Sequence, residues 1–339
     1  MPITDIDRRR SRDSREQREL HLAACYLNRV GLNEGRTTPA PIVDVTEFVP
    51  ELRGMARTTL RLHPRFGDEP SPDASKLGGH FIWPDGERWP TCSEHGIPYI
   101  TVLQLRQEDS PATSFSPGKD LLQLLWCPLD HETWTEPIAF WRTRSHSVRW
   151  TPRCPLPEEA ILDYVPVPCL LMPEQVVEFP SPRELPPELT FSLREKCSHD
   201  SRILDVVPQA FGNPYRPFDP SCESLYAVEY YEYNLSVCPS TKVGGYVHWI
   251  QHPDVPACRC GREMKYLLTL VSREYGGGDW HRWSPVEDRW RKDPTGARTG
   301  CLPGIMDAPG FMFGDVGNLH IFVCQLCPDW PVRAIGQCG

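Results

Sequence analysis

The feature that most constrains the fold is a stretch of eighteen residues that occurs twice. Residues 75–92 read SKLGGHFIWPDGERWPTC and residues 241–258 read TKVGGYVHWIQHPDVPAC, a constant displacement of 166 (241 − 75 and 258 − 92). Six of the eighteen positions are identical without a gap, where about one is expected from average composition. The identical pairs are Lys76 and Lys242, Gly78 and Gly244, Gly79 and Gly245, Trp83 and Trp249, Pro90 and Pro256, and Cys92 and Cys258. A repeat of this length predicts a domain-sized unit used twice, by internal duplication.

Bulk composition agrees with a soluble protein built mainly from strands. A chain of 339 residues can bury one large or two ordinary cores. Hydrophobic residues make up 40% and charged residues 24%, while 37 Pro and 24 Gly favour short strands and turns over long helices. We therefore expect an α+β fold, mainly antiparallel β, made of two divergent copies of one sheet-rich unit.

Charge and hydropathy argue against two classes of partner. The formal net charge of −9 disfavours nucleic acid, which proteins bind by neutralising phosphates. No apolar run approaches the roughly 20 residues of a membrane span, and the first residues lack the apolar segment of a secretory signal. With 14 cysteines and no export signal, we expect a cytoplasmic protein whose cysteines are thiols or metal ligands rather than disulfides.

The pattern along the chain divides it into four parts. Residues 1–35 form an N-terminal extension, in which apolar spacing predicts a helix over about 14–31. Residues 36–178 form the first unit, the proline-rich segment 179–189 a linker, and residues 190–339 the second unit. The stretches that we expect to be strands are 55–63, 97–105, 121–126, 134–150, 164–172, 226–237, 266–271 and 319–323.

Two closely spaced cysteine pairs in the second unit predict a metal site. Cys258 and Cys260 lie in CRCG, Cys324 and Cys327 lie in CQLC, and each pair adjoins a predicted strand. Two such pairs are how a tetrahedral four-cysteine zinc site is built, although CxC is less usual than CxxC. The alternative is four buried free cysteines.

The repeat extends this prediction to the first unit. Cys92 is the equivalent of Cys258, and His95 matches Cys260 if one residue is inserted. Cys127 follows the 121–126 strand as Cys324 follows the later one, and either His131 or Asp130 lies near the Cys327 position. The first unit therefore has a candidate site of two thiolates and two imidazoles, and the chain one or two Zn²⁺ ions.

Familiar catalytic motifs are missing. The sequence contains no HExxH, GxSxG, GxxxxGK[ST] or GxGxxG pattern, and we assign no catalytic residue. The glycine pairs at 78–79 and 244–245 are better explained by close backbone packing than by phosphate binding. The one arrangement that would suit an enzyme is a zinc site in the first unit with three protein ligands and a water molecule.

Several of these segments resemble the YwqG-like family of uncharacterised proteins. The shared segments are SKLGG, the two Trp-Pro pairs at 83–84 and 89–90, VLQL at 102–105, LLQLLWC at 121–127, KVGGYVHWIQ at 242–251, CRCGREM at 258–264 and FGDVGNLHIFVC at 313–324. Through that family the chain is similar, more distantly, to the programmed cell death protein 2 group, whose eukaryotic members are chaperones for a ribosomal protein. The resemblance implies a mixed, sheet-rich fold and protein binding rather than catalysis.

Three functional hypotheses follow. The first is a non-enzymatic, zinc-stabilised module of chaperone-like type that binds another polypeptide through a sheet edge or the groove between the copies. The second is an immunity-type protein that neutralises a toxin. The third is a zinc hydrolase built on Cys92, His95 and Cys127.

Overall fold

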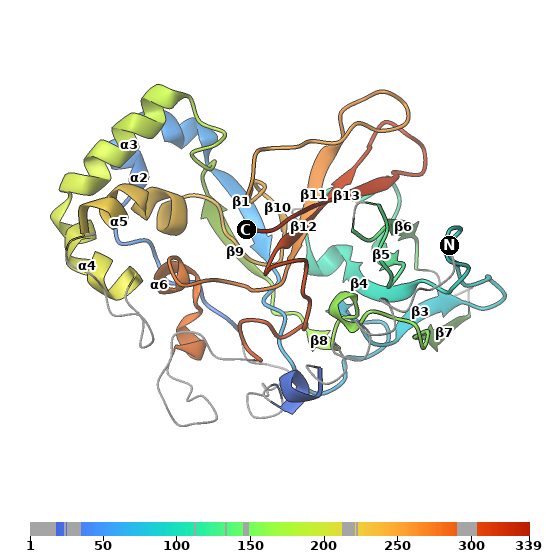
Figure 1. The fold of residues 1–339 in the computed structure, drawn as a ribbon. Coiled ribbons are helices and arrows are strands. Elements are labelled where there is room, and N and C mark those ends of the chain that lie inside the picture. Colours follow the sequence, from blue (N-terminus) through green and yellow to red (C-terminus); the bar gives the residue numbers. More distant parts are fainter. Residues whose placement is uncertain are drawn as a thin grey trace.

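The protein consists of two sheets packed side by side, with a layer of helices beyond one of them (Figure 1). The computed structural model describes residues 18–23, 25, 35–111, 113–132, 134–144, 149–211, 221, 223–289 and 304–339. One sheet has six strands in the order β13-β12-β11-β10-β1-β9, and the other has five in the order β6-β5-β4-β2-β8; strands β3 and β7 form a separate pair. All the strand pairings among the described residues are antiparallel, so the expected fold class is confirmed.

The strand bounds agree well with the hydrophobic pattern of the sequence. Strands β4, β5, β11 and β12 coincide closely with predicted stretches, whereas β2, β3, β9, β10 and β13 were not predicted. The first half contains β1 (Arg57–Arg61), β2 (Lys76–Leu77), β3 (Phe81–Pro84), β4 (Ile100–Arg106), β5 (Leu121–Trp126), β6 (Pro137–Arg142), β7 (Trp150–Arg153), β8 (Cys169–Leu170) and β9 (Glu174–Glu178). The second half contains β10 (Lys242–Gly244), β11 (Lys265–Val271), β12 (Asn318–Val323) and β13 (Val332–Gln337).

The two sheets follow the same plan. Strands β2, β4, β5 and β6 are ordered as β10, β11, β12 and β13 are. Each central strand pair also contains one irregularity, between Thr101 and Leu103 in β4 and between Tyr266 and Leu268 in β11, at positions 165 residues apart (266 − 101). The likeness extends the sequence repeat into three dimensions, and a common origin by duplication stays an inference from it.

A two-stranded ribbon joins the sheets. Strand β1 pairs with β9 from Arg57↔Glu178 to Arg61↔Glu174, and the same register continues to an isolated bridge between Arg65 and Leu170. In the six-stranded sheet β1 lies between β10 and β9, so β1 is the inner strand of the ribbon. In the five-stranded sheet the strand of the ribbon that pairs with β2 is β8, so β8 is the inner strand there. The ribbon thus enters each sheet with a different strand innermost.

One hydrophobic core spans both halves. It contains Leu103, Leu124 and Trp126 from the first half together with Leu268 and Ile321 from the second. Burial of this apolar surface is the main favourable term that holds the sheets together. The predicted unit boundaries remain a prediction, but strands β1 and β9 from residues 36–178 belong to the sheet that contains β10–β13.

The helices form a second core beside β9. Helices α2 (Val45–Phe48), α3 (Pro187–His199), α4 (Ser201–Phe211) and α5 (Glu223–Tyr230) pack around Leu193, Val207 and Tyr230, and α3 begins within the predicted 179–189 linker. Among the described residues, no helix has the length and apolarity needed to cross a bilayer. Of the predicted 14–31 helix, residues 18–23 and 25 are helical and the others lie outside the described residues.

The predicted strand over 226–237 is wrong. Residues 223–230 form α5 and Tyr231–Leu235 continue it as a π-helical turn. Tyr230 and Tyr231 belong to the aromatic pattern that resembles a strand. In the structure both are buried against Leu193 and Cys197 of α3. Tertiary packing therefore overrides a weak local preference for strand.

Candidate metal centres

The structure brings Cys258, Cys260, Cys324 and Cys327 together at one corner of the six-stranded sheet. Their sulfur atoms all lie within 4.8 Å of one another. Cys258 Sγ is 3.7 Å from Cys327 Sγ, and Cys324 Sγ is 3.7 Å from the sulfur atoms of both Cys260 and Cys327. Tetrahedral zinc with Zn–S bonds of about 2.3 Å would place its sulfur ligands about 3.8 Å apart, whereas a disulfide needs about 2.05 Å. The arrangement fits a metal ion and excludes disulfides.

The backbone around this cluster explains the CxC spacing. Cys258 N–H donates to the Arg262 carbonyl at 2.7 Å, and Gly261 N–H donates to the Cys258 carbonyl at 2.8 Å. Gly261 adopts φ +80°, a left-handed conformation that glycine takes without a steric penalty. The resulting tight turn projects both thiols to the same side. Cys324 and Cys327 come from the turn that follows β12.

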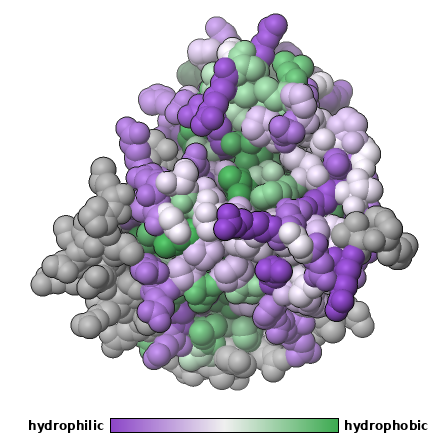
Figure 2. Space-filling model, turned by 90° about the vertical axis from the view of Figure 1, so that its right-hand side faces the viewer, coloured by the Kyte–Doolittle hydropathy of each residue, from purple (hydrophilic) through white to green (hydrophobic). Residues whose placement is uncertain are grey.

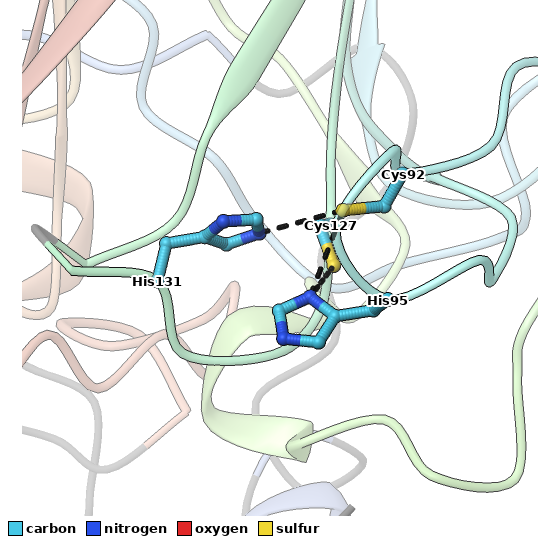
Figure 3. Close-up of side chains that lie close together, drawn as sticks. All are labelled: Cys92, His95, Cys127 and His131. Atoms are coloured by element: carbon cyan, nitrogen blue, oxygen red, sulfur yellow. Dashed lines mark hydrogen bonds between the residues drawn. The ribbon is translucent and has the colours of Figure 1, made fainter. Parts of the chain in front are cut away.

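Cys92, His95, Cys127 and His131 form the corresponding cluster in the first half. Figure 3 shows the four side chains converging from two loops, with the His131 ring directed at Cys92. His95 Nδ1 is 3.4 Å from Cys127 Sγ and 3.6 Å from Cys92 Sγ, and His131 Nε2 is 3.8 Å from Cys92 Sγ. Neighbouring nitrogen and sulfur ligands of tetrahedral zinc would be about 3.5 Å apart.

The structure resolves the choice between His131 and Asp130. The imidazole of His131 belongs to the cluster, whereas Asp130 accepts a hydrogen bond from the Tyr164 hydroxyl at 2.5 Å. All eight residues selected from the sequence therefore lie in two groups of four, and each group could hold a metal ion. Thiolate and imidazole donors favour zinc among the common ions.

A carboxylate outside the first cluster orients one of its histidines. Glu94 Oε2 lies 2.9 Å from His131 Nδ1, and Glu94 Oε1 lies 4.0 Å from His95 Nε2. Metal-bound histidines usually donate the N–H of their second ring nitrogen to such a carboxylate, which fixes the tautomer and raises the basicity of the ligand nitrogen. This arrangement fits His131 as a ligand through Nε2 and His95 through Nδ1.

The thiols differ in their electrostatic surroundings even within one cluster, since the neighbouring thiols of Cys260, Cys324 and Cys258 raise the pKa of Cys327 to about 12. Burial raises the pKa of the Cys127 thiol to about 12. Hydrogen bonding, first from the Leu326 backbone and then from that of Cys327, lowers the pKa of Cys324 to about 7. Because a metal ion binds the thiolate, binding must displace the proton of each cysteine thiol. The raised pKa of Cys127 means that its thiol loses the proton only when the positive charge of the ion stabilises the thiolate.

A tryptophan three residues after the last ligand is a signal that the sequence analysis missed. Trp134 follows His131 and Trp330 follows Cys327, and both have positive φ, +75° and +45°. Such backbone is unusual for a bulky residue. Each closes its cluster's turn: the His131 N–H donates to the Trp134 carbonyl, and the Trp330 N–H to the Cys327 carbonyl.

The two tryptophans also fasten the halves to each other. The Trp134 indole lies against Gly336 of β13 in the second half, where a Cβ would come within 2.5 Å of its Nε1. Trp330 packs on Trp141 of β6, with ring centroids 5.4 Å apart, and its carbonyl accepts from the Trp141 indole. Each candidate centre therefore sits next to the interface between the halves.

Comparison with known families then places the chain. A family model described as "Domain of unknown function (DUF1963)" matches residues 75–325, which is 251 of 339 residues (325 − 75 + 1). The chain belongs to the DUF1963 family. The DUF1963 match begins at the first copy of the repeat and includes seven of the eight cluster residues, all except Cys327. No curated protein matches the chain. The narrower resemblance to YwqG-like proteins and to the programmed cell death protein 2 group stays an expectation.

Proposed function

We propose that this DUF1963 protein is a non-enzymatic module that binds another polypeptide and is stabilised by two structural zinc ions. The support for structural zinc is the completeness of each cluster. Four side chains converge in both, and tetrahedral zinc with four protein ligands has no position for a reacting water molecule. The participation of His131 therefore speaks against the hydrolase hypothesis, which needs three ligands in the first cluster.

The observation that carries the binding proposal is a groove between the two halves. It has a volume of about 240 Å³ and is bordered by the residues before β6 on one side and by Val332–Ala334 of β13 on the other. Glu94, Glu132 and Glu136 line it. Strands β6 and β13 are the terminal strands of their sheets, and terminal strands can pair with an added extended segment.

The chemistry of this groove favours a basic, extended partner segment. Glu132 and Glu136 are exposed, so they can pair with lysine or arginine side chains without first losing other contacts. Figure 2, which views the protein from the side of β3, β6 and β7, shows polar side chains interspersed with smaller apolar patches. Such a surface suits recognition by charge and backbone pairing rather than by one large apolar contact.

The zinc proposal is tested by elemental analysis of the native protein and by chelation. We expect about two zinc ions per chain. Removal of zinc should lower the unfolding temperature, because the metal-bearing turns also hold Trp134 and Trp330 at the interface between the halves. A native protein that contains no zinc, or a chelated protein of unchanged stability, would refute the structural role.

The binding proposal is tested with a library of extended peptides that vary in charge. We expect basic peptides to bind, and the double variant Glu132→Lys/Glu136→Lys to abolish that binding. The double variant Glu188→Lys/Glu195→Lys on α3, which replaces two exposed glutamates outside the groove, is the control matched for net charge. Equal binding by the groove variant and the wild type would rule out the groove. The immunity hypothesis makes a separate prediction, namely tight binding to a single toxin.

A further inference from the structure

The repeated Lys-x-Gly-Gly turn binds a carboxylate in the second half of the protein. Glu178, the last residue of β9, is fully buried, and its carboxylate oxygens lie 2.7 and 2.9 Å from Lys242 Nζ. The same carboxylate accepts hydrogen bonds from the backbone N–H groups of Cys238 and Tyr246. A Cβ at Gly245 would collide with Glu178 Oε1, so the glycine makes room for the oxygen.

The ribbon register identifies the equivalent of Glu178 in the first half. Arg61 lies opposite Lys242, and Leu170 lies opposite Lys76. Their partners on the outer strand of the ribbon are Glu174 and Arg65. The residue four positions after Glu174 is Glu178, which binds Lys242. The residue four positions after Arg65 is Glu69, which is therefore the equivalent of Glu178 in the first half.

Glu69 does not occupy the turn as Glu178 does. Its carboxylate hydrogen-bonds to His80 Nδ1 at 2.8 Å and is 61% exposed. The point where Gly79 would carry a Cβ lies 3.3 Å from Pro168 Cβ and 4.0 Å from Glu69 Oε1, so the nearest neighbour of this glycine is a proline and not a carboxylate. Both glycines of the turn have positive φ, +59° and +69°, close to the +70° and +74° of their second-half equivalents. The turn itself is therefore shaped like the one that holds a carboxylate.

The hydrogen-bond acceptor of the Lys76 ammonium is an uncharged carbonyl, and the carboxylates of Asp73 and Glu69 act on the ammonium only from beyond ion-pair distance. The Lys76 side chain is buried, its ammonium donates to the Ser71 carbonyl, and no ion pair joins it to a carboxylate in the part of the chain that the structure describes. An ammonium has three N–H donors, and a single carbonyl satisfies only one of them. Burial is also the main reason that the pKa of Lys76 is lowered to about 8. An anionic ligand would restore the charged form.

We propose that Lys76 and the Gly78–Gly79 turn form a reversible carboxylate-binding site, filled by an aspartate or glutamate side chain of the partner polypeptide. The polypeptide source rests on the proposed function, whereas the carboxylate chemistry does not. The exposed Ser71 supplies the present acceptor of the ammonium, and the incoming carboxylate replaces the Ser71 carbonyl. The position of Cys238 is taken by Pro72, which lacks an N–H. This site therefore offers fewer donors than its buried counterpart and suits a ligand that dissociates.

The test follows the ¹³Cε signals of lysines in the full-length protein by NMR, with the Lys76→Arg variant used to assign the signal of Lys76. The probes are sodium acetate, the peptide acetyl-Ala-Ala-Glu-Ala-Ala-amide and the same peptide with Gln in place of Glu. We expect a saturable shift of the Lys76 signal and a rise in its pKa with the Glu peptide, and no change with the Gln peptide. The signal of Lys242, already paired with Glu178, is the internal control.

Three results would overturn the proposal in different ways. An unchanged Lys76 signal at about 10 mM peptide, a concentration well above typical weak dissociation constants, excludes the site. A response to acetate that equals the response to the Glu peptide excludes the polypeptide source. A Lys76 pKa that falls in the Glu69→Gln variant, without any added ligand, by as much as the Glu peptide raises it in the wild type assigns the carboxylate to Glu69 itself. Failure of the acidic-groove proposal would alter none of these signals, because its variants lie at Glu132 and Glu136.

Discussion

Replacing Glu94 with glutamine tests whether the first cluster binds metal through His131 as its geometry indicates. The substitution keeps the shape of the side chain and an acceptor oxygen but removes the charge that faces His131 Nδ1 at 2.9 Å. Loss of such a partner outside the ligand sphere typically lowers metal affinity 10- to 100-fold. Only one of the two Glu94 oxygens is within hydrogen-bonding distance of an imidazole, since the distance to His95 Nε2 is 4.0 Å.

The exposure of Glu94 sets the expected size of the effect. Its side chain is 45% exposed, so water screens much of its charge. We therefore expect a change near the low end, about tenfold in zinc affinity or about 1.4 kcal/mol. The second cluster, which has no contact with Glu94 in the described residues, should keep its affinity.

Competition with a chromophoric chelator measures both sites in one experiment. Cobalt(II) substitution identifies them, because the absorption of a tetrahedral site depends on how many thiolates bind the ion. Glu132→Gln is the matched control, since Glu132 is exposed and adjacent to His131 in sequence. An unchanged first site in Glu94→Gln, or an equal loss in Glu132→Gln, would refute the assignment of Glu94 as the residue that orients His131.

Three further tests measure the free energy of unfolding of variants at residues that are not metal ligands. Lys242→Met leaves the buried Glu178 charge without its cation and should cost about 3–5 kcal/mol, whereas Lys242→Met/Glu178→Leu should cost less; an equal cost would argue against the ion pair. Gly336→Ala places a methyl group against the Trp134 indole and should destabilise by about 1–3 kcal/mol, and unchanged stability would contradict that contact. Burial raises the pKa of Asp279 from 3.8 to about 6, so the wild type should lose up to about 3 kcal/mol as pH rises from about 4 through 6. Asp279→Asn should lack this loss, and identical pH profiles would refute it.

Much of the fold and of the two candidate centres was readable from the sequence. Strand β5 has the predicted bounds, because six consecutive apolar or buried-polar residues in LLQLLW can satisfy their backbone in a central strand. The cluster residues were found because metal ligands must come in close pairs and the repeat transferred one pattern to the other half.

The errors have a common physical cause. The segment around Tyr230 and Tyr231 alternates like a strand, but its fate depends on helix α3, which offers those rings a buried position. Strand β13 contains Gly336 and an exposed arginine, so its sequence has little strand character, and it forms because β12 supplies the pairing. Both outcomes depend on neighbours that are distant in sequence.

By itself, the sequence determined the repeat, the antiparallel character of the sheets and seven of the eight side chains of the candidate metal centres, because these depend on local pattern and on short chelating turns. The tertiary structure alone decided how the halves are joined. The ribbon that places Glu178 on Lys242, and its equivalent Glu69 away from Lys76, depends on pairing between strands more than a hundred residues apart. Such pairing leaves no periodicity in either strand, and so only the folded chain reveals that the Lys242 turn holds a carboxylate of its own chain and the Lys76 turn does not.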